Sequence, residues 1–109
     1  MDNHMRSAIM TFVQEVKQSE VYSNYSLQLK RMKERPELYG KVNEFLKMNF
    51  DIQNSESPEN VMERLEDLER EYAWLREDAL VEDFLQAELA FCRMMQEVDV
   101  LVVRELDFQ

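Results

Sequence analysis

Hydrophobic residues recur every three or four positions along most of the chain, which is the spacing of amphipathic helices. A first helix is expected to begin after a polar cap at Asp2 or Asn3. Ser19 is expected to cap a second helix, because its hydroxyl can accept a free backbone N–H and Glu20 follows at the positive end of the helix dipole. Pro36 ends the second helix and opens a third, since a proline there gives up no needed hydrogen bond. The three stripes are Met5, Ala8, Ile9, Phe12, Val13 and Val16, then Tyr22, Tyr25, Leu29 and Met32, then Leu38, Val42, Phe45, Leu46 and Asn49.

The clearest break in the chain is the polar run of residues 53–58, which ends with an expected serine cap at Ser57 followed by Pro58. A fourth helix is expected over about residues 58–76. Its hydrophobic residues form a narrow seam of the coiled-coil type, and its outer face is heavily charged. Glu66 and Arg70 have the spacing for a weak ionic contact. The seam consists of Val61, Leu65, Leu68, Tyr72 and Leu75.

The last part of the chain predicts one long helix over residues 79–106, after a break at Glu77 and Asp78 where the seam loses its phase. Two hydrophobic rows run along this helix, so that its middle is apolar most of the way round. A helix of this kind cannot lie on a surface with one side in water. We therefore expect it to be central in the chain and also to contact a second chain. The rows are Leu80, Phe84, Ala87, Phe91, Met94, Val98 and Leu101, and Val81, Leu85, Cys92, Met95 and Val102.

Together these helices predict an all-α fold, an antiparallel helical bundle of about five helices with a long C-terminal helical hairpin. The length of 109 residues predicts a single helical domain over residues 1–109. The single glycine, Gly40, cannot supply the tight turns of a β-sheet. Gly40 lies inside the third helix, where it either marks a close helix crossing or is a tolerated weak point that costs about 1 kcal/mol relative to alanine.

The charge balance narrows the choice of partners. Acidic residues number 23 and basic residues 13, for a net charge of −10. This balance argues against direct binding to nucleic acid and against docking on an anionic membrane, whereas a partner with a basic patch would be attracted. A solvated acidic surface is the simpler explanation of the charge itself. The basic cluster of Lys30, Arg31, Lys33 and Arg35 could supply some nucleic-acid binding, but it is interpreted as a complement to the end of a helix dipole.

The residue types that carry catalysis or bind metals are scarce. His4 is the only histidine, which removes zinc motifs with two histidines and the paired sites of di-iron bundles. Cys92, the only cysteine, lies in mid-helix among hydrophobic residues and is interpreted as an ordinary buried thiol. The carboxylates of the fourth helix are expected to point into solvent. We therefore predict no enzyme activity, no catalytic residue, no metal and no cofactor. One cysteine and the lack of a membrane-spanning or signal-like segment favour the cytoplasm.

Three stretches carry packing and capping patterns in a fixed order. They are residues 19–25 (SEVYSNY), residues 35–38 (RPEL) with the VNEF that begins at Val42, and residues 81–88 (VEDFLQAE). In this order, and over nearly the whole chain, the sequence resembles the YlbF/YmcA family of small bacterial regulatory proteins. The family's usual acidic residue before the proline is replaced here by Arg35.

The resemblance implies an all-helical fold that self-associates and has no known catalytic residues. It also implies a role in regulating competence, biofilm formation and sporulation, through complexes of partner proteins that influence RNA processing. Some complexes of the family are associated with iron–sulfur clusters. A single cysteine cannot ligate such a cluster alone, so no cluster is expected in this chain.

Both lines of reasoning predict a non-catalytic regulatory or scaffold protein that acts by protein–protein interaction, as a homo-oligomer and with other regulatory proteins. The alternative is a regulator that binds nucleic acid, which the net charge of −10 argues against. The last helix is the predicted contact surface, because its hydrophobic circumference exceeds what the remaining helices can cover. The predicted contact residues are Phe84, Phe91, Met94, Met95, Val98, Leu101 and Val102.

Overall fold

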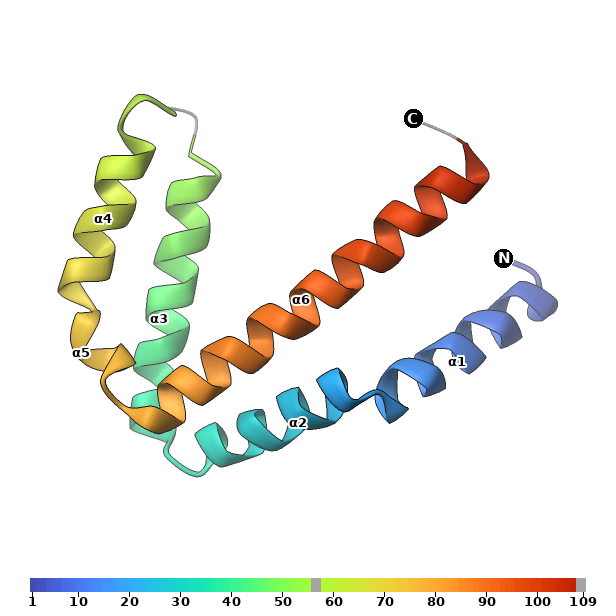
Figure 1. The fold of residues 1–109 in the computed structure, drawn as a ribbon, viewed down its shortest axis with the longest axis horizontal. Coiled ribbons are helices and arrows are strands. Elements are labelled where there is room, and N and C mark those ends of the chain that lie inside the picture. Colours follow the sequence, from blue (N-terminus) through green and yellow to red (C-terminus); the bar gives the residue numbers. More distant parts are fainter. Residues whose placement is uncertain (56–57, 108–109) are drawn as a thin grey trace.

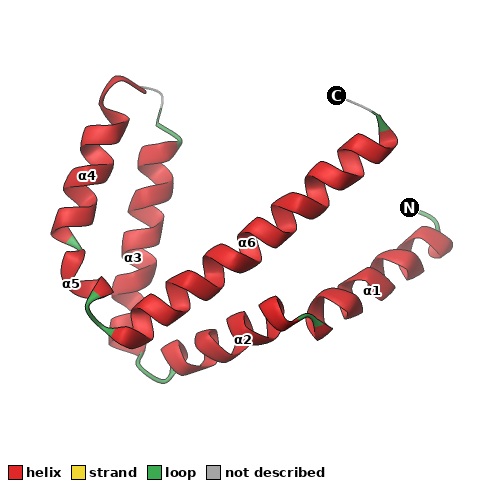
Figure 2. Cartoon of the chain, in the orientation of Figure 1, coloured by secondary structure: helices red, strands yellow, loops and turns green. Residues whose placement is uncertain are grey.

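The computed structural model describes residues 1–55 and 58–107, and in these residues it contains helices and no strand (Figure 2). The all-α class predicted from the sequence is therefore confirmed. The elements in chain order are α1 (Asn3–Gln18), α2 (Glu20–Lys33), α3 (Pro36–Gln53), the 3-10 turn η1 (Pro58–Asn60), α4 (Val61–Glu71), α5 (Ala73–Arg76) and α6 (Ala79–Leu106).

The helix starts follow the expected caps. The Asp2 side chain accepts from the backbone N–H of Met5 at 2.7 Å, and Ser19 Oγ accepts from that of Tyr22 at 3.1 Å. Pro36 is the first residue of α3. The cap expected at Ser57 lies outside the described residues. These boundaries depend on contacts within a few residues, which is why the sequence alone predicts them.

The fourth predicted helix is interrupted, in contrast to the continuous helix expected over residues 58–76. A 3-10 turn precedes α4, α4 ends at Glu71, and Tyr72 separates it from the four-residue α5. The Tyr72 ring is buried and packs against Phe45 at a centroid distance of 5.5 Å. Packing of this residue into the core at the end of α4 accompanies the change of direction. On the outer face Arg70 pairs with Asp67 and not, as expected, with Glu66.

Two arms meet at an angle and give the molecule the shape of a V (Figure 1). In one arm, α3 and α4 lie side by side and antiparallel. In the other, α6 packs against α2 and continues beside α1, so that the start of α1 and the end of α6 lie at the same tip. The long C-terminal helix therefore packs mainly against α2 rather than forming a hairpin with the helix before it. The radius of gyration is 17.4 Å, whereas a compact chain of this length has about 13 Å.

The hydrophobic core lies in one half of the molecule. We call the core half α2–α5 together with residues 79–88 of α6, and the distal arm α1 together with residues 89–106. All fully buried residues among those described belong to the core half, and α1 buries none. The core consists of Met32, Val42, Phe45, Ile52, Leu68, Tyr72, Leu75, Val81 and Phe84.

Asp78 connects the start of α6 to the start of α3. Its carboxylate accepts from the backbone N–H of Leu80 at 2.9 Å and pairs with Arg35 at 3.1 Å. The hydrogen bond from Leu80, together with Arg35, holds the pKa of Asp78 below its usual value. Arg35 therefore has a structural role at the point where the two arms join, and its side chain does not cap α3.

Gly40 does not mark a close helix crossing. A Cβ placed on Gly40 would meet nothing within 4 Å among the described residues, and its φ is not positive. Of the two interpretations that the sequence left open, the structure supports a tolerated weak point in α3.

Candidate protein-interaction surfaces

The seven residues predicted for the contact surface all lie on α6, and they differ in how far they are exposed to solvent. Phe84 is 1% exposed and belongs to the core. Phe91 is half-buried because the rings of Tyr22 and Tyr25 pack against it at centroid distances of 5.5 and 5.0 Å. Met94 and Val98 are also half-buried, and the exposed members are Met95, Leu101 and Val102. The helix is thus central at its beginning and uncovered toward its end.

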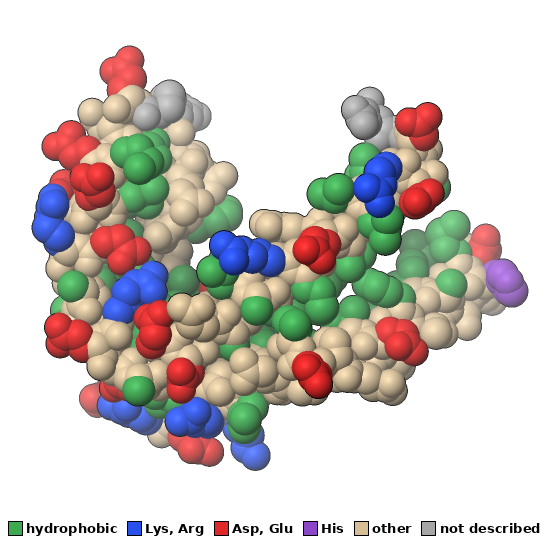
Figure 3. Space-filling model, viewed as in Figure 1, with side chains coloured by type: hydrophobic (Ala, Val, Ile, Leu, Met, Phe, Trp, Pro, Cys, Tyr) green, Lys and Arg blue, Asp and Glu red, His purple; other side chains and the backbone are tan. Residues whose placement is uncertain are grey.

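The exposed residues of α6 adjoin a hydrophobic face of α1. A hollow of about 280 Å³ between the two helices has only hydrophobic residues in its walls. Leu101 and Val102 are each 47% exposed. Hydrophobic side chains gather along the distal arm in the space-filling view (Figure 3). We call this surface the distal face, and its residues are Met5, Ala8, Ile9, Phe12, Met95, Val98, Leu101 and Val102.

A second hydrophobic surface lies inside the V, where Figure 3 shows the molecule hollowed between the two arms. Its volume is about 580 Å³. Phe50, on its α3 side, is 66% exposed. We call it the inner groove, and it is lined from α3 by Phe45, Leu46, Asn49, Phe50 and Gln53, from α5 by Arg76, and from α6 by Leu85, Gln86, Glu88, Leu89, Cys92 and Gln96.

The two charged residues of the inner groove differ in their partners. Arg76 pairs with Glu69 at 3.2 Å and with Glu82 at 3.3 Å, and its guanidinium lies 5.7 Å from the centroid of the Phe45 ring. Glu88 is half-buried and has no cation partner among the described residues. Burial raises the pKa of the Glu88 carboxyl, because a charge is less stable where it is partly removed from water.

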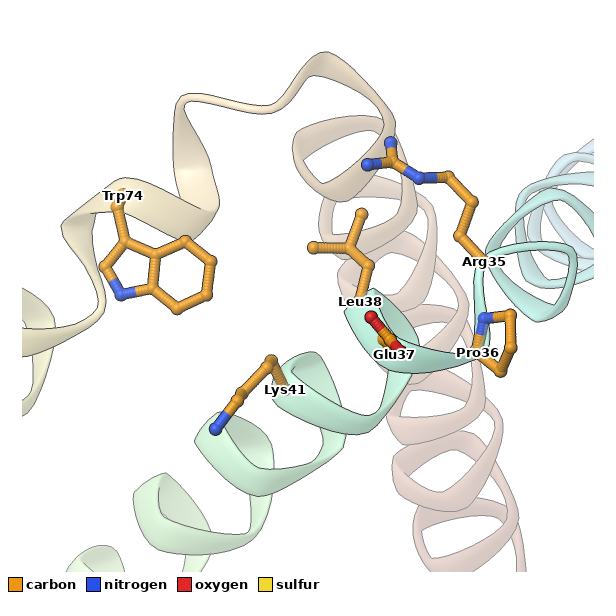
Figure 4. A pocket seen from close by; sticks show the side chains of 6 residues that line it. All are labelled: Arg35, Pro36, Glu37, Leu38, Lys41 and Trp74. Carbon is orange, nitrogen blue, oxygen red and sulfur yellow. The ribbon is translucent and has the colours of Figure 1, made fainter.

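A third hollow, of about 620 Å³, lies where α5 faces the start of α3. Figure 4 shows the Trp74 indole across from Leu38 and Lys41. Trp74 is 50% exposed. The cations at the hollow already have partners, since Arg35 pairs with Asp78 at 3.1 Å and Lys41 with Glu44 at 3.4 Å. This hollow therefore offers a hydrophobic contact more than a charged one.

The prediction that Cys92 is a buried thiol is wrong, because Cys92 is exposed on the wall of the inner groove. Its neighbours in sequence are hydrophobic, but the helix turns this position toward the space between the arms and away from α2. In residues 1–55 and 58–107 no group of three or more His, Cys, Asp or Glu side chains could hold a metal ion. Nor do these residues include a helix with the length and apolar character needed to cross a bilayer.

A family model described as control of competence regulator ComK, YlbF/YmcA, matches residues 7–107. The chain belongs to the YlbF/YmcA family. The match includes all three stretches on which the resemblance was recognised, and the description of the YlbF/YmcA family gives the chain a regulatory role in bacteria. No curated protein and no solved structure matches the chain.

Sequence reasoning missed two features of these surfaces. Trp74 lies between the seam residues Tyr72 and Leu75, so a reading limited to the seam passes over it. A lone tryptophan off the seam of a charged helix was the available signal. Glu88 was missed because its partial burial results from the packing of α6 against α2, which is a long-range contact.

Proposed function

We propose that residues 1–109 form a single helical domain that regulates by binding other proteins in the cytoplasm and catalyses no reaction. The protein self-associates through the distal face and joins other regulatory proteins in a complex that influences RNA processing, and with it competence, biofilm formation or sporulation. Membership of the YlbF/YmcA family supports the regulatory part of this proposal. The uncovered distal face supports the part that concerns binding.

The surface area of the chain is the observation that carries the proposal. The chain exposes 8582 Å². A compact protein of this length exposes roughly 6,400 Å², so the surplus is about 2,000 Å². A standard protein–protein interface takes about 800 Å² from each partner, and obligate dimers take more. The surplus is therefore large enough for a stable interface between two copies.

The distal face has the composition of such an interface. All residues that line its hollow are hydrophobic, and none of the α1 side chains is buried within its own chain. Two distal arms placed face to face would bring α1 and α6 of each copy into a four-helix arrangement, in which each hydrophobic stripe gains a partner. Phe84 supports the start of α6 from the core and makes no direct contact in this arrangement.

Light scattering on purified protein tests self-association. Val102→Asp and Ile9→Asp each place a carboxylate in the distal face, so the measured mass should fall to that of one chain while the helical circular dichroism stays unchanged. Met62→Asp is the matched control, because Met62 is an exposed hydrophobic residue on α4 in the other arm. A wild-type mass of one chain, or an oligomer that survives both substitutions, would contradict the proposal.

Affinity capture from the native host tests the regulatory part. Wild-type protein should retain a defined set of proteins, including factors of RNA processing. Val102→Asp should retain fewer of them if partners bind the assembled oligomer, whereas Met62→Asp should retain the same set. Recovery of the same proteins with an unrelated acidic helical protein would count against a specific complex.

A further inference from the structure

We propose that the inner groove binds an amphipathic helix of a different protein, and that this helix carries a lysine or arginine that pairs with Glu88. The site shares no residue with the distal face and goes beyond the proposed self-association. Three features of the groove support this proposal: its shape, its hydrophobic floor and the charge on its edge.

The shape of the groove suits a helix. The α6 residues Leu85, Leu89, Cys92 and Gln96 follow one another at steps of four, three and four, so they lie along one side of the helix. The same side continues beyond the groove through Val100 and Val103. From Leu85 to Val103 the rise along a helix is about 27 Å. A second helix of five turns could lie along this stripe with its other edge against α3.

The floor of the groove is hydrophobic, and apart from Arg76 and Glu88 its polar lining residues are uncharged amides. Phe45, Leu46 and Phe50 face the Leu85 and Leu89 side of α6 across the hollow. The amides on the edges are Asn49, Gln53, Gln86 and Gln96. A hydrophobic centre with a polar rim is the usual anatomy of a protein interface, and a hydrophobic groove with this spacing is how proteins bind amphipathic helices.

The charge of the groove favours a basic partner over a second copy. Glu88 flanks the stripe as a half-buried carboxylate that lacks a cation, because the guanidinium of Arg76 is engaged by Glu69 and Glu82. A lysine or arginine from outside would compensate the buried charge and gain a partly desolvated ion pair. The net charge of −10 also attracts a basic helix to the chain.

Cys92 provides a reporter for the test, because it is the only thiol and lies exposed on the groove wall. The probes are three designed helical peptides of about 18 residues, about 27 Å long, with one hydrophobic stripe and a lysine, glutamine or glutamate at one flanking position. The measurement is the rate at which Cys92 of the full chain reacts with a disulfide reagent as peptide is added.

The lysine peptide should slow the reaction of Cys92 in a saturable way. The glutamine peptide should bind about tenfold more weakly, and the glutamate peptide should give no protection. Glu88→Gln should remove the preference for lysine over glutamine. Glu66→Gln is the matched control, since it makes the same charge change on the exposed outer face of α4 and should keep the preference.

Three results would overturn the proposal. The first is no protection by the lysine peptide, and the second is a lysine preference that Glu88→Gln leaves intact. The third is a thiol that is unreactive in the free protein and becomes reactive on dilution, because a second copy would then occupy the groove. Leu89→Asp should prevent protection without changing the mass set by the distal face. This last comparison separates the groove from self-association, so that either can fail alone.

Discussion

The core half and the distal arm are built from the same kind of amphipathic helix, yet only the core half is complete within one chain. In the core half, side chains such as Val42, Val81 and Phe84 are almost wholly removed from water. In the distal arm, hydrophobic residues at the same helical spacing remain exposed, as Ile9 and Val102 do. The same pattern therefore gives a core where four helices converge and an uncovered hydrophobic surface where only two run together.

The largest expected effect is in the core half. Phe84→Ala removes a ring that packs against Tyr25 and Tyr39 at centroid distances of 6.2 Å and should lower the free energy of unfolding by about 3–5 kcal/mol. Val102→Ala, measured where the protein is a single chain, should change it by no more than about 0.5 kcal/mol. Urea denaturation followed by circular dichroism measures both. Similar losses at the two positions would remove the distinction between the regions.

Asp78→Ala should be the next in size, because it removes both the cap of α6 and the contact with Arg35. The lowered pKa of Asp78 gives stability that is present above the ordinary carboxyl pKa and is lost as the pH falls through the lowered one. The difference in unfolding midpoint between wild type and variant should thus be largest near neutral pH and should shrink as the pH falls. Asp78→Asn keeps a capping oxygen and should be milder. A gap independent of pH would contradict this account.

Gly40→Ala should stabilise the protein by about 0.5–1 kcal/mol, since alanine is the better helix former and the position is open. Thermal unfolding measures the gain. Because Gly40 belongs to the core half, the mass of the protein measured by light scattering should stay the same. A loss of stability or of the oligomer would show that a partner chain approaches α3 at this residue.

The smallest effect is expected for Glu88→Gln, with a pH dependence opposite to that of Asp78. Burial raises the pKa of Glu88, so in the folded chain its carboxylate is destabilising above that pKa, and wild type loses stability as the pH rises through it. The glutamine variant should therefore be the more stable at neutral pH, with a margin that shrinks in acid. Urea titrations at two pH values measure the margin. A margin that grew in acid would show that Glu88 has a cation partner.

The sequence predicted best what depends on neighbouring residues. The caps at Asp2 and Ser19, the start at Pro36 and the bounds of the last helix all follow from local hydrogen bonding and spacing. The interruption of the helix at Tyr72 was missed because the hydrophobic seam runs unbroken through that residue. The interruption accompanies the packing of Tyr72 against Phe45, a contact between residues far apart in the sequence. The partner of α6 was also missed, since periodicity shows which residues are hydrophobic and not which helix will face them.

The candidate surfaces divide in the same way. That α6 has more hydrophobic circumference than its own chain covers could be inferred from two rows of residues. Which end of α6 stays uncovered could not be inferred, because it depends on how far α2 reaches along α6. Cys92 illustrates this limit of sequence-based prediction. Whether its thiol is buried or exposed depends on which helix packs against its side of α6, and the sequence does not show that.

A single residue, Ser19, joins α1 to α2 in an extended conformation, and α1 contributes nothing to the buried interior of the described chain. The first 18 residues are thus not needed for the core. A shortened chain that starts at Ser19 would retain every core side chain and the cap of α2. The residues that stabilise the fold therefore lie in a different part of the sequence from the exposed hydrophobic residues of α1. Substitutions at Met5, Ile9 or Phe12 would change this exposed surface without removing a core side chain.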